Sequence, residues 1–436
     1  MNTPTGSPRY ISTRGSGESV SFREALLNGL APDGGLYIPD YIPKLPESVW
    51  TGQRSFPDMA FHVLRPWLLR EVPDEPLREI LQDALSFPVP LVPLTHRDWN
   101  GVFVLELFHG PTLSFKDFGA RVMARLMVYF LRGDDVTILV ATSGDTGSAV
   151  ADGFSGREGL RVALMYPEGQ VSPTQEQQLI LRRPGVRTFA VSGSFDDCQR
   201  MVKAVLVDKS LSQVRLSAAN SINVGRLLPQ MLYYVWAVLV GKLKNAMVCV
   251  PSGNLGNLTG GVLAAFSGLP VQGFLAAHNS NDGFPRYLEG DPIPFGASVR
   301  TLSNAMDVGK PSNFERISAL LPRPELRRWI RGESVDDDAT QASVRRVYEA
   351  TGYMADPHTA VGLEATRRYR MVSGDRRPCV VMATAHPAKF PEALSAALGF
   401  APEIPERLAT LRQRPTEVAP LAATDAALKD ALLAWT

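Results

Sequence analysis

The stretch VTILVATSGDTGSAVA, residues 136–151, carries the pattern that decides the fold. Its first six residues form an apolar run that does not alternate with polar residues, which is typical of a strand buried on both faces of a parallel sheet. A turn of glycine, serine, threonine and aspartate follows at 142–147, and small residues then recur at helical spacing. The stretch therefore predicts a strand, a turn and a helix, the repeating unit of a doubly wound α/β fold.

Similar apolar runs recur along the chain and support the same architecture. They are LRVALMYP (160–167), AMVCVPSG (246–253), VQGFLAAH (271–278) and CVVMATAH (379–386). Before them, Ser21 and Glu24 have the spacing of a helix capping box, and Gly29 is placed to end that helix. The prolines of FPVPLVPL, residues 87–94, exclude a helix or a central strand and mark a boundary near residue 90. We predict two doubly wound parallel-sheet lobes behind an N-terminal extension.

Composition excludes several classes of protein. The 436 residues include 45 basic and 44 acidic side chains, so no net charge favours nucleic acid or an anionic membrane. The longest apolar run, residues 231–240, is about half of the ~20 residues that a membrane span needs, and the N-terminus lacks the apolar core of a signal peptide. Three widely spaced cysteines form neither a disulfide framework nor a zinc motif. We predict a cytoplasmic enzyme.

Two turns between a strand and a helix are candidate anion sites. One is TSGDTG at 142–147, and the other lies in VPSGNLGNLTGGVLAAF, residues 250–266. Backbone N–H groups at a helix start bind phosphate or carboxylate, although each turn equally suits a helix that only caps itself. The glycine spacing is not that of a dinucleotide fingerprint, and the Gly-Lys-Ser/Thr of a P-loop is missing. A nucleotide-binding protein is therefore a poor fit.

Other polar residues have both an ordinary and a functional interpretation. Arg226, just before the apolar run at 231–240, is suited to clamp a phosphoryl group or simply to face solvent. Thr384 lies at the end of a buried strand, where a hydroxyl usually satisfies the core. His358 and His386 lack metal-ligand spacing, and we predict that both are structural or support other site residues without binding a ligand themselves. The three acidic residues Asp336–Asp338 are typical of a solvent-exposed helix start, so we predict no metal site there.

Lys116 lies in LELFHGPTLSFKDFGARV, residues 105–122, among turn formers and hydroxyls. From these neighbours alone, Lys116 has three possible roles: an ordinary surface charge, a cation that binds phosphate, or an amine that forms a Schiff base. One lysine in this setting, two candidate phosphate cradles and no metal or catalytic-triad signature together suggest pyridoxal phosphate. That inference reaches a cofactor class but not a reaction.

The ordered set of motifs resembles the threonine synthase family, in its longer bacterial and fungal branch. The similarity extends over nearly the whole chain, and the order of the motifs makes it specific. The motifs are STRGSGESVSFREALLNGLAPDGGLYIPD (12–40), LFHGPTLSFKDFGAR (107–121), VATSGDTGSAVA (140–151), SGSFDDCQ (192–199), NSINVGRLLPQ (220–230), PSGNLGNLTGG (251–261), TLSNAMDVGKPSNFER (301–316), DPHTAVG (356–362) and ATAHPAKFPEAL (383–394).

The resemblance implies fold type II pyridoxal-phosphate architecture, as in the β subunit of tryptophan synthase. It implies an N-terminal extension at 1–90, a large cofactor-binding lobe at 91–135 and 241–436, and a small mobile lobe at 136–240. We further expect the stretch from Pro402 onward to form peripheral helices.

The resemblance also assigns roles to residues. Lys116 matches the lysine that forms the imine with the cofactor, and Thr384 matches the hydroxyl that faces its pyridine nitrogen. Asp145 aligns with a residue near the cofactor's 3′-oxygen that is often Asn in relatives. The cofactor-phosphate loop is matched by Gly253, Asn254, Leu255, Gly256 and Asn257. The residues expected to bind the substrate's carboxylate and phosphate are Ser143, Thr146, Asn223 and Arg226.

The implied reaction converts O-phospho-L-homoserine and water to L-threonine and phosphate, with Lys116 as the base at Cα. We expect a monomer that acts on this small molecule. Two alternatives remain at this point: a related enzyme that only eliminates and gives 2-oxobutyrate, and a non-catalytic ligand-binding relative. The second would be expected to lose Lys116 or its phosphate loop, and this chain keeps both.

Overall fold

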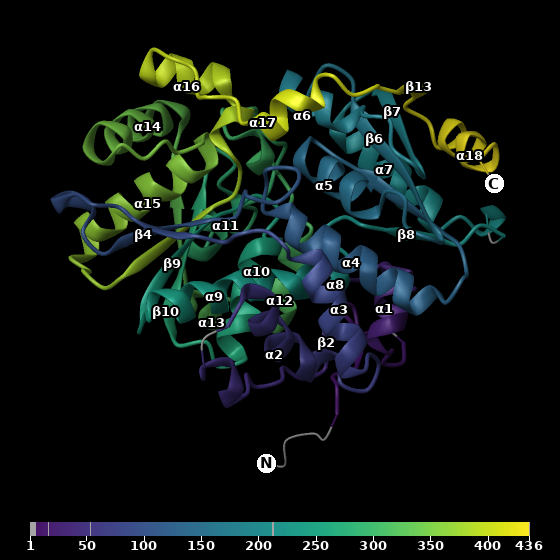
Figure 1. Ribbon diagram of the computed structural model, residues 1–436, viewed down its shortest axis with the longest axis horizontal. Helices are drawn as coiled ribbons and strands as arrows, with labels where there is room; N and C mark the ends of the chain where they lie inside the picture. Colours follow the sequence, from purple (N-terminus) through teal and green to yellow (C-terminus); the bar gives the residue numbers. More distant parts are fainter. Residues whose placement is uncertain (1–5, 16, 53, 212, 436) are drawn as a thin grey trace.

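The structure is a computed structural model that describes residues 6–15, 17–52, 54–211 and 213–435. Two twisted sheets lie side by side, with helices over their faces and an N-terminal helical region beneath them (Figure 1). The sequence predicted two parallel-sheet lobes behind an N-terminal extension, and the described residues form this arrangement.

The first sheet has five parallel strands in the order β13-β7-β6-β5-β8. Its central strands are buried along almost their whole length, as their apolar runs predict. The strands are β5 (Val136–Ala141), β6 (Leu160–Pro167), β7 (Val186–Ser192), β8 (Leu216–Ala218) and β13 (Ala419–Ala422). The helices that accompany it are α5 (Asp145–Phe154), α6 (Pro173–Leu179), α7 (Phe195–Leu206) and α18 (Asp425–Leu433).

The second sheet has six strands in the order β11-β10-β9-β12-β4-β3, and only the short edge strand β3 is antiparallel. The strands are β3 (Leu91–Pro93), β4 (Val102–Glu106), β9 (Ala246–Pro251), β10 (Val271–His278), β11 (Ile330–Ser334) and β12 (Cys379–Ala383). Its helices include α10 (Gly256–Phe266), α11 (Gly283–Glu289), α12 (Asn313–Leu320), α13 (Arg323–Trp329), α14 (Asp337–Thr351), α15 (Pro357–Ser373), α16 (Pro391–Leu398) and α17 (Glu406–Leu411). Helix α4 (Lys116–Leu131) packs mainly against α5 of the five-stranded sheet. All five apolar runs singled out in the sequence form strands.

The C-terminal segment departs from its expected place. We expected only peripheral helices beyond Pro402, within the large lobe, but residues 419–422 form β13. This strand pairs in parallel with β7 and so completes the five-stranded sheet rather than the six-stranded one (Figure 1). The reason is that β7 would otherwise be an open sheet edge, whose unpaired backbone groups need a partner. The division into lobes otherwise remains a prediction.

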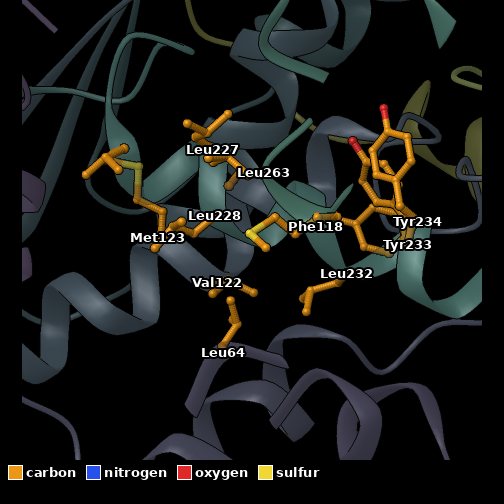
Figure 2. Packing of buried hydrophobic residues seen from close by; sticks show 14 of the residues in the cluster. Leu64, Phe118, Val122, Met123, Leu227, Leu228, Leu232, Tyr233, Tyr234 and Leu263 are labelled. Carbon is orange, nitrogen blue, oxygen red and sulfur yellow. The ribbon is translucent and has the colours of Figure 1, made fainter. Parts of the chain in front are cut away.

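The N-terminal region packs against the sheets through one large apolar core. It comprises β1 (Tyr10–Ser12), β2 (Tyr37–Pro39), α1 (Phe22–Asn28), α2 (Phe56–Leu68) and α3 (Asp74–Ala84). The predicted capping box of Ser21 and Glu24 begins α1, and Gly29 ends it. Figure 2 shows Leu64 of α2 facing Val122 of α4, with side chains of the central helices around them. This core fixes α4, whose first residue is Lys116.

The apolar run at 231–240 lies inside this core. It belongs to a helical stretch, α8 (Val224–Leu227), a short 3₁₀ turn and α9 (Met231–Gly241), that is long and apolar enough to span a membrane by composition alone. Of this stretch, 78% is buried within the protein, and Tyr233 and Tyr234 are both in the core (Figure 2). The stretch is a core helix, as the sequence indicated.

Candidate active site

One cleft collects nearly all the predicted site residues at the carboxyl ends of the strands. This is where ligands bind in open parallel sheets, because the loops that leave the strands converge there. The cleft is lined by Lys116 and Thr384, by Ser143, Asp145 and Thr146 after β5, by Arg226, and by Gly253, Asn254, Leu255, Gly256 and Asn257 after β9.

Lys116 is held in this cleft by its own loop. The N–H of Phe115 donates to the carbonyl of Thr384 at 2.9 Å, and Ser114 bridges to Ala385, so the loop is fastened to the end of β12. Burial lowers the pKa of the Lys116 amine to about 8, with further lowering by Lys389 and Arg226 that Asp145 opposes. Lys116 is therefore an amine that is easily deprotonated.

The turn after β9 presents free backbone donors. Leu255 takes a left-handed conformation, with φ of 60°, immediately before α10 begins. The N–H groups of Gly253, Asn254 and Leu255 donate no hydrogen bond within the described parts of the chain, and the first N–H groups of a helix have no intrahelical acceptor. The Nδ2 of Asn257 is buried and also unpaired among these residues. These donors form a cradle for an anion.

Glycine is required in this cradle by close backbone approach. A Cβ on Gly253 would lie 2.8 Å from the Cα of Met306, which is too close for any side chain. The neighbouring Asn254 ties the turn to the rest of the site, because its Nδ2 donates to the hydroxyl of Ser221 at 2.6 Å.

The turn after β5 uses its backbone donors differently. The hydroxyl of Thr142 accepts from the N–H groups of Gly144 at 3.0 Å and Gly147 at 2.8 Å. The hydroxyls of Ser143 and Thr146 line the cleft and make no hydrogen bond to another described residue. This turn therefore caps itself and offers two side-chain hydroxyls to a ligand.

Arg226 is a buried cation without an anionic partner. Its side chain is 3% exposed, its Nη1 donates to the carbonyl of Ala219, and its Nε has no acceptor among the described residues. Within the described ranges no carboxylate lies within ion-pair distance of it, and burial lowers its pKa to about 10. A buried charge of this kind needs an anion, so the cleft has a second place for a phosphate or carboxylate.

Thr384 follows the last residue of β12, as predicted. Its side chain is 6% exposed and lines the cleft, and its hydroxyl makes no hydrogen bond to the rest of the described chain. A buried hydroxyl usually has a partner, so this one is left for a ligand.

Asn223 does not belong to the cleft, against our expectation. Its Nδ2 donates to the carbonyls of Leu26 and Ala218, and its Oδ1 accepts from the N–H of Gly225, so it caps α8 from a fully buried position. An asparagine just before a helix can either cap the helix or bind a ligand. Here both the nitrogen and the oxygen of the amide are bonded to the protein's own backbone. The cleft is lined instead by its neighbours Asn220 and Ser221.

Sequence reasoning also missed Lys389. Its Nζ lies 2.5 Å from the Oδ1 of Asp145, directly behind the cleft, and the lysine is completely buried. Burial alone would raise the pKa of Asp145, but the charges of Lys389 and Lys116 and a hydrogen bond from Gln175 hold it well below its usual range. The only available signal was a lysine in AHPAKF just after a buried strand.

Both histidines are hydrogen-bonded to neighbouring parts of the protein. His358 lines the cleft, but its Nδ1 bonds Asp356 at 2.7 Å and its Nε2 accepts from the N–H of Ala305. His386 accepts from the N–H of Ala388 and caps the following turn. No group of three or more histidine, cysteine or acidic residues suited to a metal ion occurs in the described parts of the chain.

The residues present fit one cofactor class. A partly buried lysine of lowered pKa, a cradle of free N–H groups and an unpaired hydroxyl at a strand end match an aldehyde, a phosphate and a ring nitrogen on one molecule. The family model for pyridoxal-phosphate-dependent enzymes matches residues 85–384. The fold and the cleft therefore define a pyridoxal-phosphate-dependent enzyme.

Comparison with known proteins gives the narrower family. Models of the threonine synthase N terminus and C-terminal region match residues 9–85 and 359–432. Threonine synthase from Escherichia coli is 40% identical over 426 residues, covering 95% of this chain and 97% of its own, and that from Saccharomyces cerevisiae is 35% identical, covering 94% and 95%. The chain belongs to the threonine synthase family of pyridoxal-phosphate-dependent lyases.

Solved structures agree with this assignment. The E. coli threonine synthase superposes with a TM-score of 0.90 at 37% identity, covering 98% of this chain and all of its own. A threonine synthase from Brucella melitensis with pyridoxal phosphate bound has the same TM-score at 35% identity, covering 98% and 99%. A threonine deaminase from Solanum lycopersicum, at 15% identity and a TM-score of 0.53, shares the fold alone.

Proposed function

We propose that this enzyme converts O-phospho-L-homoserine and water to L-threonine and phosphate in the cleft around Lys116. The observation that carries the proposal is the presence of two separate anion sites in one cleft, the cradle at 253–257 and the buried Arg226. A cofactor phosphate needs one of them, and a substrate that brings its own phosphate needs the other. A substrate without a phosphate would leave the buried guanidinium unpaired.

Lys116 has two roles in this proposal. It bonds covalently to the cofactor, and as a free amine it takes the proton from the substrate's α-carbon. A pKa of about 8 leaves part of the amine neutral near physiological pH, which a base requires. Bound pyridoxal phosphate supplies the electron-withdrawing ring that stabilises negative charge at that carbon.

The other residues of the cleft bind and orient. The cradle at 253–257 would hold the cofactor's phosphate, and the Thr384 hydroxyl would bind its ring nitrogen. Ser143 and Thr146 hold the substrate's carboxylate through their free hydroxyls, and Arg226 holds its phosphate. Asn223 is not part of this set. We keep the prediction of a monomeric, cytoplasmic enzyme.

Product analysis tests the reaction. Purified protein saturated with pyridoxal phosphate is incubated with O-phospho-L-homoserine, and amino acids, 2-oxo acids and phosphate are quantified by chromatography. Threonine and phosphate in equal amounts support the proposal, with Lys116→Ala as the inactive control. If 2-oxobutyrate forms instead of threonine, the enzyme is an eliminating relative and the proposed replacement is wrong. If neither product forms, the catalytic proposal fails.

A further inference from the structure

A buried ion pair lies directly behind the cleft. The Nζ of Lys389 is 2.5 Å from the Oδ1 of Asp145 and donates to the carbonyl of Thr112 at 3.1 Å. Asp145 also accepts from the Nε2 of Gln175 at 3.0 Å. Asp145 lines the cleft with a side chain that is 3% exposed, whereas Lys389 is out of contact with solvent and does not line the cleft.

The two partners come from different sheets. Asp145 begins α5, which follows β5 of the five-stranded sheet, whereas Lys389 lies in the turn after β12 of the six-stranded sheet. Taking two charges out of water is costly, and apolar residues of similar volume are often as stable as a buried ion pair. Stability alone is thus a weak reason for this arrangement, and the position beside the cleft suggests a functional one.

Lys116 is the group that this pair affects. The charged residues that act most strongly on Lys116 are Asp145 from α5, Lys389 from the turn after β12 and Arg226 from α8. Asp117, the next residue, is turned away and accepts from the N–H and hydroxyl of Thr112. Asp145 is therefore the one anion among these groups that favours a protonated Lys116.

Asp145 is not bonded to Lys116, however. No ion pair of Lys116 within 4.0 Å occurs among the described residues, while the carboxylate of Asp145 is engaged by Lys389 and Gln175. Lys389 thus competes for the anion and adds a positive charge that opposes protonation of Lys116. Without Lys389, Lys116 would be the remaining cation that acts strongly on the carboxylate.

We propose that Lys389 is a positioning residue that holds the carboxylate of Asp145 away from Lys116 and so keeps the Lys116 amine available in its neutral form. The proposal rests on the role of Lys116 given under the proposed function. It assigns Lys389 no contact with substrate or cofactor, and its effect passes entirely through Asp145 and the local charge.

The test follows cofactor capture rather than turnover. Apoprotein is mixed with pyridoxal phosphate between pH 6 and 10, and the rate at which the visible absorption of the bound cofactor appears is plotted against pH. Capture needs the neutral amine, so the wild-type rate should rise through a midpoint of about 8. In Lys389→Met the midpoint should move up by about one pH unit or more, which slows capture about tenfold at pH 7.

Three further variants separate charge from structure. Asp145→Asn should move the midpoint down, because the anion is lost and Lys389 remains. The double variant Lys389→Met/Asp145→Asn removes both charges, should fold even if the single lysine variant does not, and should return the midpoint to within about half a unit of wild type. Lys429→Met removes the partner of Asp208 in a partly exposed ion pair and should leave the midpoint unchanged.

An unchanged midpoint in both single variants, Lys389→Met and Asp145→Asn, would overturn the proposal, even if unfolding in urea showed that they are less stable. If Lys389→Met does not fold, a midpoint of the double variant equal to that of Asp145→Asn would overturn it. The variant Lys116→Ala distinguishes this outcome from an error in the proposed function. If that variant developed the same absorption with the same pH profile, the role of Lys116 itself would be wrong. An error in the proposed substrate leaves the capture experiment unaffected, because no substrate is present.

Discussion

The two turns that enter the cleft, 142–147 after β5 and 252–257 after β9, have similar compositions but opposite electrostatics. Both join a buried strand to a helix through glycine and short polar residues. The first directs two of its N–H groups to the hydroxyl of Thr142 and carries Asp145 in the first turn of its helix. The second has no acidic residue in its first helical turn, and the N–H groups of residues 253–255 are free among the described residues.

This difference favours the second turn as the phosphate site. A helix start attracts anions only while its donors and its positive end remain available. In the first turn, the Thr142 hydroxyl accepts hydrogen bonds from two backbone N–H groups, and the negative charge of Asp145 opposes the binding of another anion. The hydroxyls of Ser143 and Thr146 remain to bind a ligand. Composition alone made the two turns look equivalent, and the hydrogen bonds separate them.

The largest effect is expected at Arg226, which lies in the same cleft as the two turns. If the turn at 252–257 holds the cofactor's phosphate, the substrate's phosphate depends on this guanidinium. Arg226→Gln should lower kcat/KM for O-phospho-L-homoserine by roughly 10³-fold, because a buried charge-assisted contact is worth several kcal/mol. Cofactor affinity, measured by absorbance titration, should change less than about threefold. A large loss of cofactor affinity would instead place the cofactor's phosphate at Arg226.

The next effect is expected in the second turn. Gly253→Ala places a Cβ against the backbone of Met306 and must displace the cradle, so the Kd for pyridoxal phosphate should rise by roughly 10²-fold. Gly296→Ala is the matched control, because its added Cβ meets nothing within 4 Å. Equal affinities in the two variants would show that the cradle does not bind the cofactor.

A smaller effect is expected from the hydroxyls of the first turn. Ser143→Ala removes one donor to the substrate's carboxylate and should raise KM about tenfold, the value of one hydrogen bond to a charged group. Steady-state kinetics at saturating cofactor measures this change, and the cofactor's Kd should stay constant. A rise in cofactor Kd with unchanged KM would reverse the roles of the two turns.

The smallest effect is expected from Thr142, whose hydroxyl caps the first turn. Thr142→Val leaves the N–H groups of Gly144 and Gly147 without their acceptor and should lower the free energy of unfolding by about 1–3 kcal/mol. Urea denaturation measures this loss, and cofactor affinity should remain within about threefold of wild type. Loss of affinity without loss of stability would mean that Thr142 serves the ligand rather than the turn.

Much of the fold followed from local patterns because burial on both faces makes a strand apolar throughout. The runs at 136–141 and 246–251 show this directly. Strand β13 was missed because APLA at 419–422 is short and mostly exposed, and its only reason to be a strand is the distant edge of β7. Non-local pairing of this kind leaves little trace in local sequence.

The site residues also divide into those that the sequence predicted and those that it did not. Lys116 and the cradle were predicted because an ordered set of motifs surrounds them, and the structure brings them into one cleft. Asn223 was misassigned because a cap and a ligand require the same amide at the same place before a helix. Lys389 was missed because burial and charge pairing are properties of the folded chain, and a lysine in sequence is normally a surface residue.

Strand β13 also bears on how the chain is made. Roughly 230 residues separate the end of β7 from the start of β13, and at about 5–20 residues per second a ribosome needs some ten to fifty seconds to synthesise them. Throughout that interval the edge of β7 has no partner strand, although β5 and β6 have already been synthesised and β8 follows within about 30 residues. An open edge invites pairing with other chains. During synthesis, the open edge of β7 is therefore a place where a chaperone has something to protect.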